Sequence, residues 1–229
     1  MRNLALMWVL AGCLLGCGEK EAKDIAPDTD TTFTDKRDGK VYRKIAIGSQ
    51  TWMAENLNYA AKGSVCYNND TEYCEVCGRL YKWSTAKQSC PAGWHLPEID
   101  EWAMLENFVG DSLTAGTKLK SVEGWRSYDD WVMIDNFLYG TSKSTEGWNY
   151  ATNEYGFSAL ACGDGFGDSS FSNTAGRYGL WWSATERDTN NVFYLTMSFN
   201  EEKVSRHYAY KTNLRSVRCV LDDEKARRK

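Results

Sequence analysis

The sequence has no excess of basic residues, because 31 Asp and Glu residues outnumber 27 Lys and Arg residues. With a formal net charge of −4, the chain lacks the positive charge that neutralises phosphates, so nucleic acid is excluded as an expected partner. Histidine and proline are scarce as well, with only 2 and 3 residues. Neither His95 nor His207 stands in a nucleophile motif, and no catalytic residue is predicted.

The chain also lacks an apolar run of the ~20 residues that a membrane-spanning helix needs. The apolar residues 4–15 follow Arg2 and have the length of the hydrophobic region of a signal peptide. This run ends in Leu-Leu-Gly-Cys at Cys17, which predicts a lipoprotein signal peptide over residues 1–16 and a lipidated Cys17. Cys13 ends a second motif of this kind, and an ordinary secretory signal is the other alternative.

The segments at the two ends of the mature chain are polar. Residues 17–31 are polar and acidic, which is typical of a flexible tether. Residues 223–229 form a basic tail, either a solvated terminus or a contact for an anionic envelope polymer. We therefore expect an exported protein that is anchored to the bacterial envelope by its N-terminal lipid. The expected location is the outer membrane.

What the sequence does contain is aromatic residues, at 14% with 10 Trp, together with 19 Gly. Such a composition fits strands joined by glycine-rich loops better than a helical bundle. Alternation predicts strands over residues 41–47, 192–199, 203–210 and 214–221. A short helix is predicted within 80–89, and a clearer one after Pro97, where the apolar stripe is Trp102, Leu105, Phe108 and Val109. The order of these elements predicts the α+β class.

Six cysteines remain after Cys13 and Cys17: Cys66, Cys74, Cys77, Cys90, Cys162 and Cys219. An even number in an exported chain favours disulfides. The alternative is a zinc site, because four of the six thiols lie between residues 66 and 90.

Two acidic residues in a glycine-rich stretch are candidate calcium ligands. Asp164 and Asp168 stand in the pattern Asp-x-Gly-x-Asp, and oxygen ligands in such a loop suit Ca²⁺. The alternative is a tight turn that these residue types also favour. No other cofactor is expected.

Aromatic residues in the irregular region 110–178 are the candidate ligand contacts. Exposed Trp125, Trp131 and Trp148 would stack on sugar rings or anchor a protein partner, with Asn149 and Tyr150 beside Trp148. The alternative is that these tryptophans hold long loops against the domain.

Six blocks of the sequence carry a family resemblance: TWMAENLNY (51–59), GRLYKW (78–83), CPAGWHLP (90–97), YGFSAL (155–160), WWSATE (181–186) and SVRCV (216–220). In this order they resemble the Fibrobacter succinogenes major paralogous domain, over residues 32–222. The blocks are also similar to the C-type-lectin-like fold and, distantly, to the formylglycine-generating enzyme group. The resemblance implies two short helices packed on antiparallel strands, with long loops rich in Gly and Trp.

The chain departs from these relatives at functional positions. It lacks the Glu-Pro-Asn, Gln-Pro-Asp and Trp-Asn-Asp triplets of calcium-dependent lectins, and it lacks the close cysteine pair of formylglycine-generating enzymes. Glu98 also stands where the family has Ser or Thr, so we expect a weaker helix cap there.

The resemblance also implies a disulfide between Cys90 and Cys219, since related folds join those two elements. Turn-forming residues between Cys66 and Cys74 favour a small closed loop, which leaves Cys77 to pair with Cys162.

The expected function is a non-catalytic binding module for carbohydrate or a protein partner, attached to the membrane through its lipid. The alternatives are a purely structural envelope lipoprotein and a divergent enzyme of the formylglycine-generating type.

Overall fold

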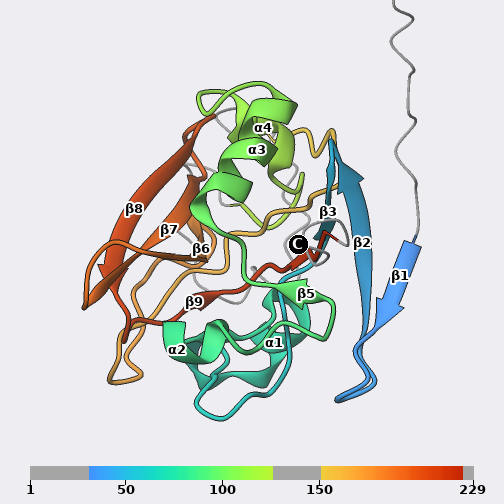
Figure 1. Ribbon diagram of the computed structural model, residues 1–229. Coiled ribbons are helices and arrows are strands. Elements are labelled where there is room, and N and C mark those ends of the chain that lie inside the picture. Colours follow the sequence, from blue (N-terminus) through green and yellow to red (C-terminus); the bar gives the residue numbers. More distant parts are fainter. Residues whose placement is uncertain (1–30, 126–150, 224–229) are drawn as a thin grey trace, which may run out of the picture.

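Two β-sheets of five strands each and four short α-helices make up the domain (Figure 1). This arrangement is a computed structural model that describes residues 31–125 and 151–223. It confirms the α+β class, with two helices more than predicted. Within the described residues, no helix combines the length and the apolar character that a membrane crossing needs.

The first sheet contains both ends of the described chain. Its strands follow the order β1, β2, β3, β10 and β5, and all neighbours are antiparallel. The predicted strand 41–47 is confirmed as β2. The bounds are β1 Thr31–Thr34, β2 Val41–Ile47, β3 Gln50–Met53, β10 Val220–Leu221 and β5 Trp94–His95.

The two edge strands of this sheet approach each other through their side chains. Phe33 of β1 stacks on Trp94 of β5, with ring centroids 4.4 Å apart and planes 22° apart. Because three strands lie between β1 and β5 in the hydrogen-bonded order, this contact requires a strongly curved sheet.

The second sheet has the strand order β4, β9, β6, β7 and β8. Its pairs are antiparallel except β6 with β9, which are parallel. The predicted strands 192–199 and 203–210 are confirmed as β7 and β8, each within one residue. The bounds are β4 Leu80–Tyr81, β9 Arg215–Ser216, β6 Tyr178–Glu186, β7 Asn191–Ser198 and β8 Val204–Tyr210.

The prediction of one continuous strand over 214–221 is wrong. The chain pairs in the second sheet as β9, leaves it, and pairs in the first sheet as β10. The segment 217–219 crosses between the sheets, and Val217, Arg218 and Cys219 on it are all buried. The apolar pattern that predicted a strand therefore reflects burial between two sheets.

The helices are short and lie between strands. They are α1 Thr71–Cys77, preceded by a 3-10 turn at Tyr67–Asn69, then α2 Trp83–Ala86, α3 Ile99–Val109 and α4 Ala115–Leu119. The prediction of a helix within 80–89 is correct only for α2, because Leu80 and Tyr81 pair as β4.

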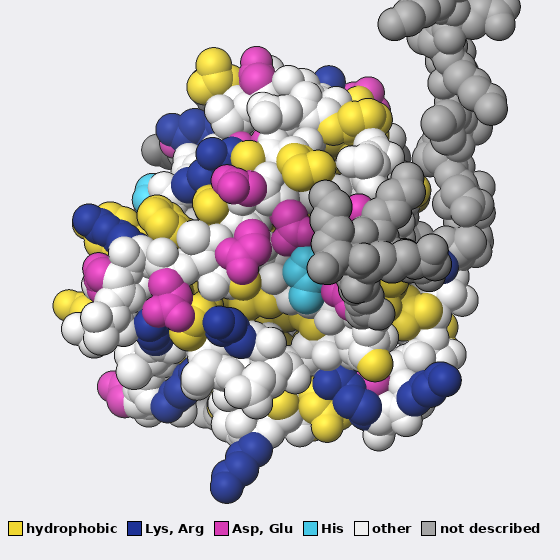
Figure 2. Space-filling view, viewed as in Figure 1, with side chains coloured by type: hydrophobic (Ala, Val, Ile, Leu, Met, Phe, Trp, Pro, Cys, Tyr) yellow, Lys and Arg dark blue, Asp and Glu magenta, His cyan; other side chains and the backbone are white. Residues whose placement is uncertain are grey.

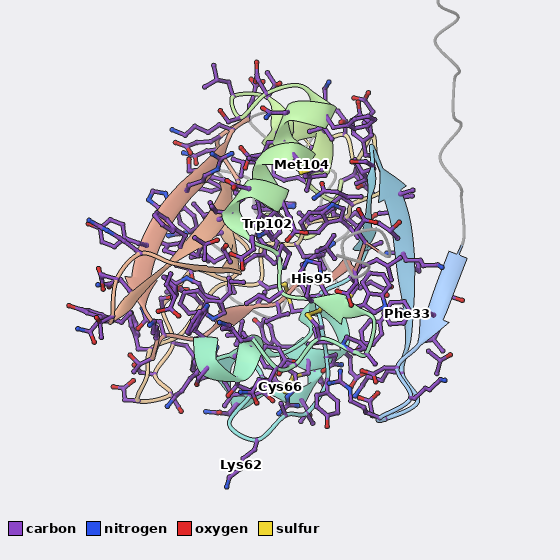
Figure 3. All side chains as sticks on the ribbon, in the orientation of Figure 1. Phe33, Lys62, Cys66, His95, Trp102 and Met104 are labelled. Atoms are coloured by element: carbon purple, nitrogen blue, oxygen red, sulfur yellow. A yellow bond between two sulfur atoms is a disulfide. The ribbon has the colours of Figure 1, made fainter. Side chains whose placement is uncertain are left out.

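Helix α3 fills the space between the sheets with one apolar face. Trp102 lies below the helix, 4.7 Å from Trp52 between ring centroids, whereas Met104 lies on the outer side (Figure 3). The expectation that Phe108 shares the buried stripe is wrong, since Phe108 is exposed. Glu106 is buried instead. A residue four positions after Trp102 lies on nearly the same side of the helix as Trp102, whereas Phe108, six positions after it, does not.

Three disulfides cross-link the domain: Cys66–Cys74, Cys77–Cys162 and Cys90–Cys219. These are the three expected pairings, with Cα–Cα distances of 5.2, 5.6 and 5.9 Å. The zinc alternative is wrong, because its four thiols are divided among the three bonds. Disulfides persist in oxidising compartments, so this set indicates an extracytoplasmic domain.

Candidate functional site

Trp125 is not the exposed ligand contact that was expected. Its side chain is only 6% exposed, and its Nε1 donates a hydrogen bond to the Ala159 carbonyl oxygen at 3.0 Å. The Lys120 ammonium lies 5.3 Å from the centre of its ring. Trp125 therefore holds the segment after α4 against the core, as the alternative interpretation proposed.

The other loop candidates lie outside the described residues. They are Trp131, Trp148, Asn149 and Tyr150, and their role as ligand contacts stays a prediction. The same holds for the lipidated Cys17, the signal peptide, most of the tether and most of the basic tail.

Asp164 and Asp168 have separate partners in the protein. The Asp164 carboxylate accepts hydrogen bonds from the hydroxyls of Ser172 and Thr174, and lies 3.6 Å from Arg215. Asp168 accepts from the backbone N–H of Ser170 at 2.9 Å, as in an Asx turn. Across the described part of the chain, no three His, Cys, Asp or Glu residues gather in a group able to hold a metal. The turn interpretation accounts for these contacts.

His95 has a structural position, as expected. Its Nδ1 lies 2.5 Å from Oδ1 of Asp222, and its Nε2 lies 2.9 Å from Oε1 of Glu101. Burial raises the pKa of Glu101, but hydrogen bonds from His95 and from the Glu98 N–H outweigh it and hold this pKa below its ordinary value. Figures 2 and 3 show the imidazole at the surface, among acidic side chains near the C-terminal end. The ring thus links the start of α3 to the end of β10.

The matched sequence blocks meet inside the domain, around Asn56. Its Oδ1 accepts hydrogen bonds from Trp181 Nε1 and from Arg218 Nη2, both at 2.8 Å. Its Nδ2 donates to the Cys77 carbonyl oxygen at 2.9 Å. One amide therefore joins the segment after β3 to β6, to the crossing segment 217–219 and to the end of α1.

Arg218 is fully buried and completes this network. Its guanidinium also donates to the Phe157 carbonyl oxygen and lies 4.5 Å from the centre of the Phe157 ring. Burial lowers the pKa of Arg218 to about 9, which still leaves it charged at neutral pH. This network specifies how the segments assemble, and it has no exposed group that would bind a ligand.

Exposed aromatic residues lie on strand β8, where they were not sought. Tyr208 and Tyr210 are 54% and 64% exposed, and their two-residue spacing places both on one face of the strand. Among the described residues, β8 pairs only with β7 and forms the edge of its sheet. Figure 2 shows hydrophobic and basic side chains side by side along the edge that carries β8 in Figure 1.

The Tyr208–Tyr210 face is bordered by a fixed polar turn. The guanidinium carbon of Arg187 lies 3.3 Å from the centre of the Tyr208 ring, which restricts that ring. The Asp188 carboxylate accepts from the backbone N–H of Asn190 and from Asn191. Sequence reasoning missed this face because alternation predicted the strand without showing that its tyrosines lie on a solvent-facing edge.

In the comparison with known families, residues 45–221 match the Fibrobacter succinogenes major domain (Fib_succ_major). No curated protein and no solved structure matches the chain. The matched region runs from β2 to β10, includes all three disulfides and contains both Asn56 and Arg218. The chain therefore belongs to the Fibrobacter succinogenes major domain family.

Proposed function

We propose that this protein is a lipid-anchored envelope protein whose folded domain binds carbohydrate without catalysing a reaction. The observation that carries the proposal is the pair of exposed tyrosines on β8, Tyr208 and Tyr210. Two large aromatic side chains exposed on one face of a strand are typical of a binding surface. A protein partner and a purely structural envelope role are the alternatives that the tests below separate.

The surroundings of the two tyrosines favour a sugar chain. A sugar ring presents C–H groups that pack on an aromatic ring, and hydroxyls that need hydrogen-bonding partners. Here the rings stand beside the polar turn 187–191, which offers guanidinium, carboxylate and amide groups. Arg187 restricts Tyr208 before any ligand arrives, which lowers the entropic cost of binding.

The place where the chain enters the domain supports this choice of surface. The tether joins β1, on the right in Figure 1, whereas β8 forms the opposite side. With its lipid on Cys17, a chain of this length reaches at most about 50 Å from the membrane to β1. In this arrangement the Tyr208–Tyr210 face lies on the side of the domain opposite its anchor point. We propose that the lipid anchor lies in the outer membrane.

Two features support the absence of catalysis. All six cysteines of the described residues are in disulfides, so they provide no reactive thiol of the kind that formylglycine-generating enzymes use. Both nitrogens of His95 face carboxylates, without a nucleophile between them. We also propose a C-type-lectin-like arrangement for the fold, supported by the Cys90–Cys219 bond, which ties the segment between α2 and β5 to the segment before β10.

A retention screen tests the binding function. The full chain, extracted in mild detergent, is passed over immobilised neutral and acidic polysaccharides, with and without Ca²⁺. We expect retention on at least one polysaccharide. Retention on none of them, from protein with its disulfides intact, would contradict the proposal and favour the structural role.

The anchor is tested separately by metabolic labelling with an acyl-chain analogue. Cys17→Ser should abolish labelling and membrane association, whereas Cys13→Ser should leave both unchanged. Labelling that disappears only in Cys13→Ser would place the lipid on the other cysteine.

A further inference from the structure

A small cleft lies between the start of β2 and helix α1, away from β8. Its volume is about 280 Å³, and Val41 and Val76 form exposed apolar walls. Glu55, Asn58 and Glu75 add carboxylate and amide groups, and Lys40 an ammonium group. This volume is below the usual range for drug-sized ligands, so the cleft suits a smaller polar molecule.

Cross-links hold both walls of the cleft in place. The α1 wall is fixed at Cys74 by the bond to Cys66 and at Cys77 by the bond to Cys162. The opposite wall is tied to it, because the Asn56 side chain donates to the Cys77 carbonyl oxygen. A cleft with such walls needs little ordering when a ligand binds, which favours affinity.

Gly78 closes the corner between the two walls. Its φ of +71° is a left-handed conformation, and a Cβ there would lie 2.7 Å from the Leu57 carbonyl oxygen. Only glycine therefore allows the walls to approach this closely. The cleft thus depends on two of the segments that carry the family resemblance, 51–59 and 78–83.

The charges in the cleft are mostly compensated. Glu55 pairs with Arg43 at 2.9 Å, and Lys40 pairs with Asp38 at 3.2 Å. Glu75 forms no ion pair with the residues that the structure describes. The remaining charge is that of one carboxylate, which disfavours anions and suits a neutral or singly positive ligand.

We infer that this cleft binds one sugar residue, neutral or carrying an amino group, with Glu75 accepting hydrogen bonds from its hydroxyl or ammonium groups. Val41 and Val76 pack against the C–H groups of the ring. This inference takes its ligand class from the proposed function, and it assigns the recognition of a single sugar or a chain end to a site distinct from β8.

Titration calorimetry with free glucose, glucosamine and N-acetylglucosamine tests the inference on the detergent-extracted full chain. We expect measurable binding of at least one of the three. Glu75→Gln should weaken that affinity about tenfold, since the sugar would then donate to a neutral amide oxygen instead of a carboxylate. Glu72→Gln, on the same helix but outside the cleft, is the matched control and should leave the affinity unchanged. Because Glu72 and Glu75 are exposed, neither change is expected to affect folding.

The outcomes separate the cleft from the Tyr208–Tyr210 face. Monosaccharide binding that Glu75→Gln weakens, and that Tyr208→Ala with Tyr210→Ala leaves intact, supports the inference. No binding of any of the three sugars, or equal affinities for Glu75→Gln and the parent chain, overturns it. In that case retention on polysaccharides through β8 would still stand, so failure of the cleft and failure of the proposed function are distinguishable.

Discussion

At the scale of single residues, the domain buries the Lys120 ammonium against carbonyl oxygens, with no carboxylate of the described residues in an ion pair with it. Lys120 is fully buried, and its ammonium donates to the carbonyl oxygens of Ser198 and Glu201 at 3.1 and 2.8 Å. Burial lowers the pKa of Lys120 to about 8, although Glu202 and Glu201 oppose this effect. The carbonyls offset only part of the desolvation cost, so the charged form destabilises the native state relative to a neutral one.

Lys120 makes the free energy of unfolding depend on pH in a defined direction. Its folded pKa of about 8 lies below the ordinary 10.5, so above pH 8 the unfolded chain binds more protons. Stability from this group therefore rises with pH, by at most about 1.4 kcal/mol per pH unit. Chemical denaturation at pH 7, 8 and 9 should show this rise in the parent chain and a flatter profile in Lys120→Met.

Lys62→Met is the control for this measurement, because Lys62 extends into solvent (Figure 3). It should keep the pH dependence of the parent chain. A profile for Lys120→Met that parallels the parent between pH 8 and 9 would contradict the account of the buried ammonium.

The same scale shows why site residues are hard to predict from sequence. Tryptophan carries the same chemistry whether it is buried or exposed, and Trp125 is buried because the Ala159 carbonyl accepts from its indole. Tyr208 and Tyr210 lie on a strand that pairs with β7 alone among the described residues, and only the strand order reveals this position at the edge of a sheet. Asn56 lies in a recognisable block, but the two donors to its Oδ1 are 125 and 162 residues away.

At the scale of elements, helix α3 is capped from another strand. The Ile99 N–H donates to Oγ1 of Thr185 in β6 at 2.9 Å, and that hydroxyl also bonds the Glu98 carboxylate. The Glu101 side chain accepts from the Glu98 N–H at 2.8 Å. The hydroxyl that the sequence lacks at position 98 is thus supplied by β6, and the cap couples the helix to the sheet.

Removal of this hydroxyl should destabilise the domain. Thr185→Val keeps the shape of the side chain but loses the acceptor, and we expect a loss of about 1 kcal/mol in unfolding free energy. Thr185→Ser keeps the hydroxyl and should remain closer to the parent chain than Thr185→Val does. Equal denaturation midpoints for Thr185→Val and the parent would show that the shared cap contributes nothing.

Strands that alternate over many residues could be predicted from the sequence. The nine-residue β6 was not predicted, because residues 179–183 are buried in succession and show no alternation. β2, β7 and β8 alternate over at least seven residues, so their period is visible. β4, β5, β9 and β10 have two residues each, and their pairing is determined by the partner strands. Helix α1 follows an Asp70 cap and contains two disulfide cysteines, Cys74 and Cys77, but its seven residues give too little periodicity.

At the scale of the whole molecule, disulfides connect segments that are distant in the chain. Cys90 and Cys219 are 129 residues apart, whereas Cys66 and Cys74 are 8 apart. Loop-closure entropy then makes the first bond worth on the order of 5 kcal/mol and the second roughly 2–3 kcal/mol.

Paired substitutions test this order of contributions. Changing Cys90 and Cys219 together to Ser should lower the thermal midpoint more than changing Cys66 and Cys74 together. Scanning calorimetry on both double variants measures the difference. A greater loss for Cys66 and Cys74 would mean that the short loop contributes more than closure entropy alone.

At the scale of the whole molecule, the start of the described chain and the proposed binding surface also lie on opposite sides of the domain. The described chain begins at β1, the sheets and α3 form the body, and β8 lies on the far side (Figure 1). The central claim is that carbohydrate binds on the Tyr208–Tyr210 face, and two exposed side chains are enough to test it without disturbing the core.

The most direct test is the Kd of the full chain for a polysaccharide that retains it, measured for the parent, Tyr208→Ala, Tyr210→Ala and Leu113→Ala. Leu113 is an equally exposed apolar residue before α4 and serves as the control. We predict that each tyrosine change raises Kd about tenfold, because each removes a central aromatic contact, while the melting temperature stays close to that of the parent. Leu113→Ala should leave Kd unchanged. Unchanged Kd values in both tyrosine variants would contradict the claim that β8 is the binding surface.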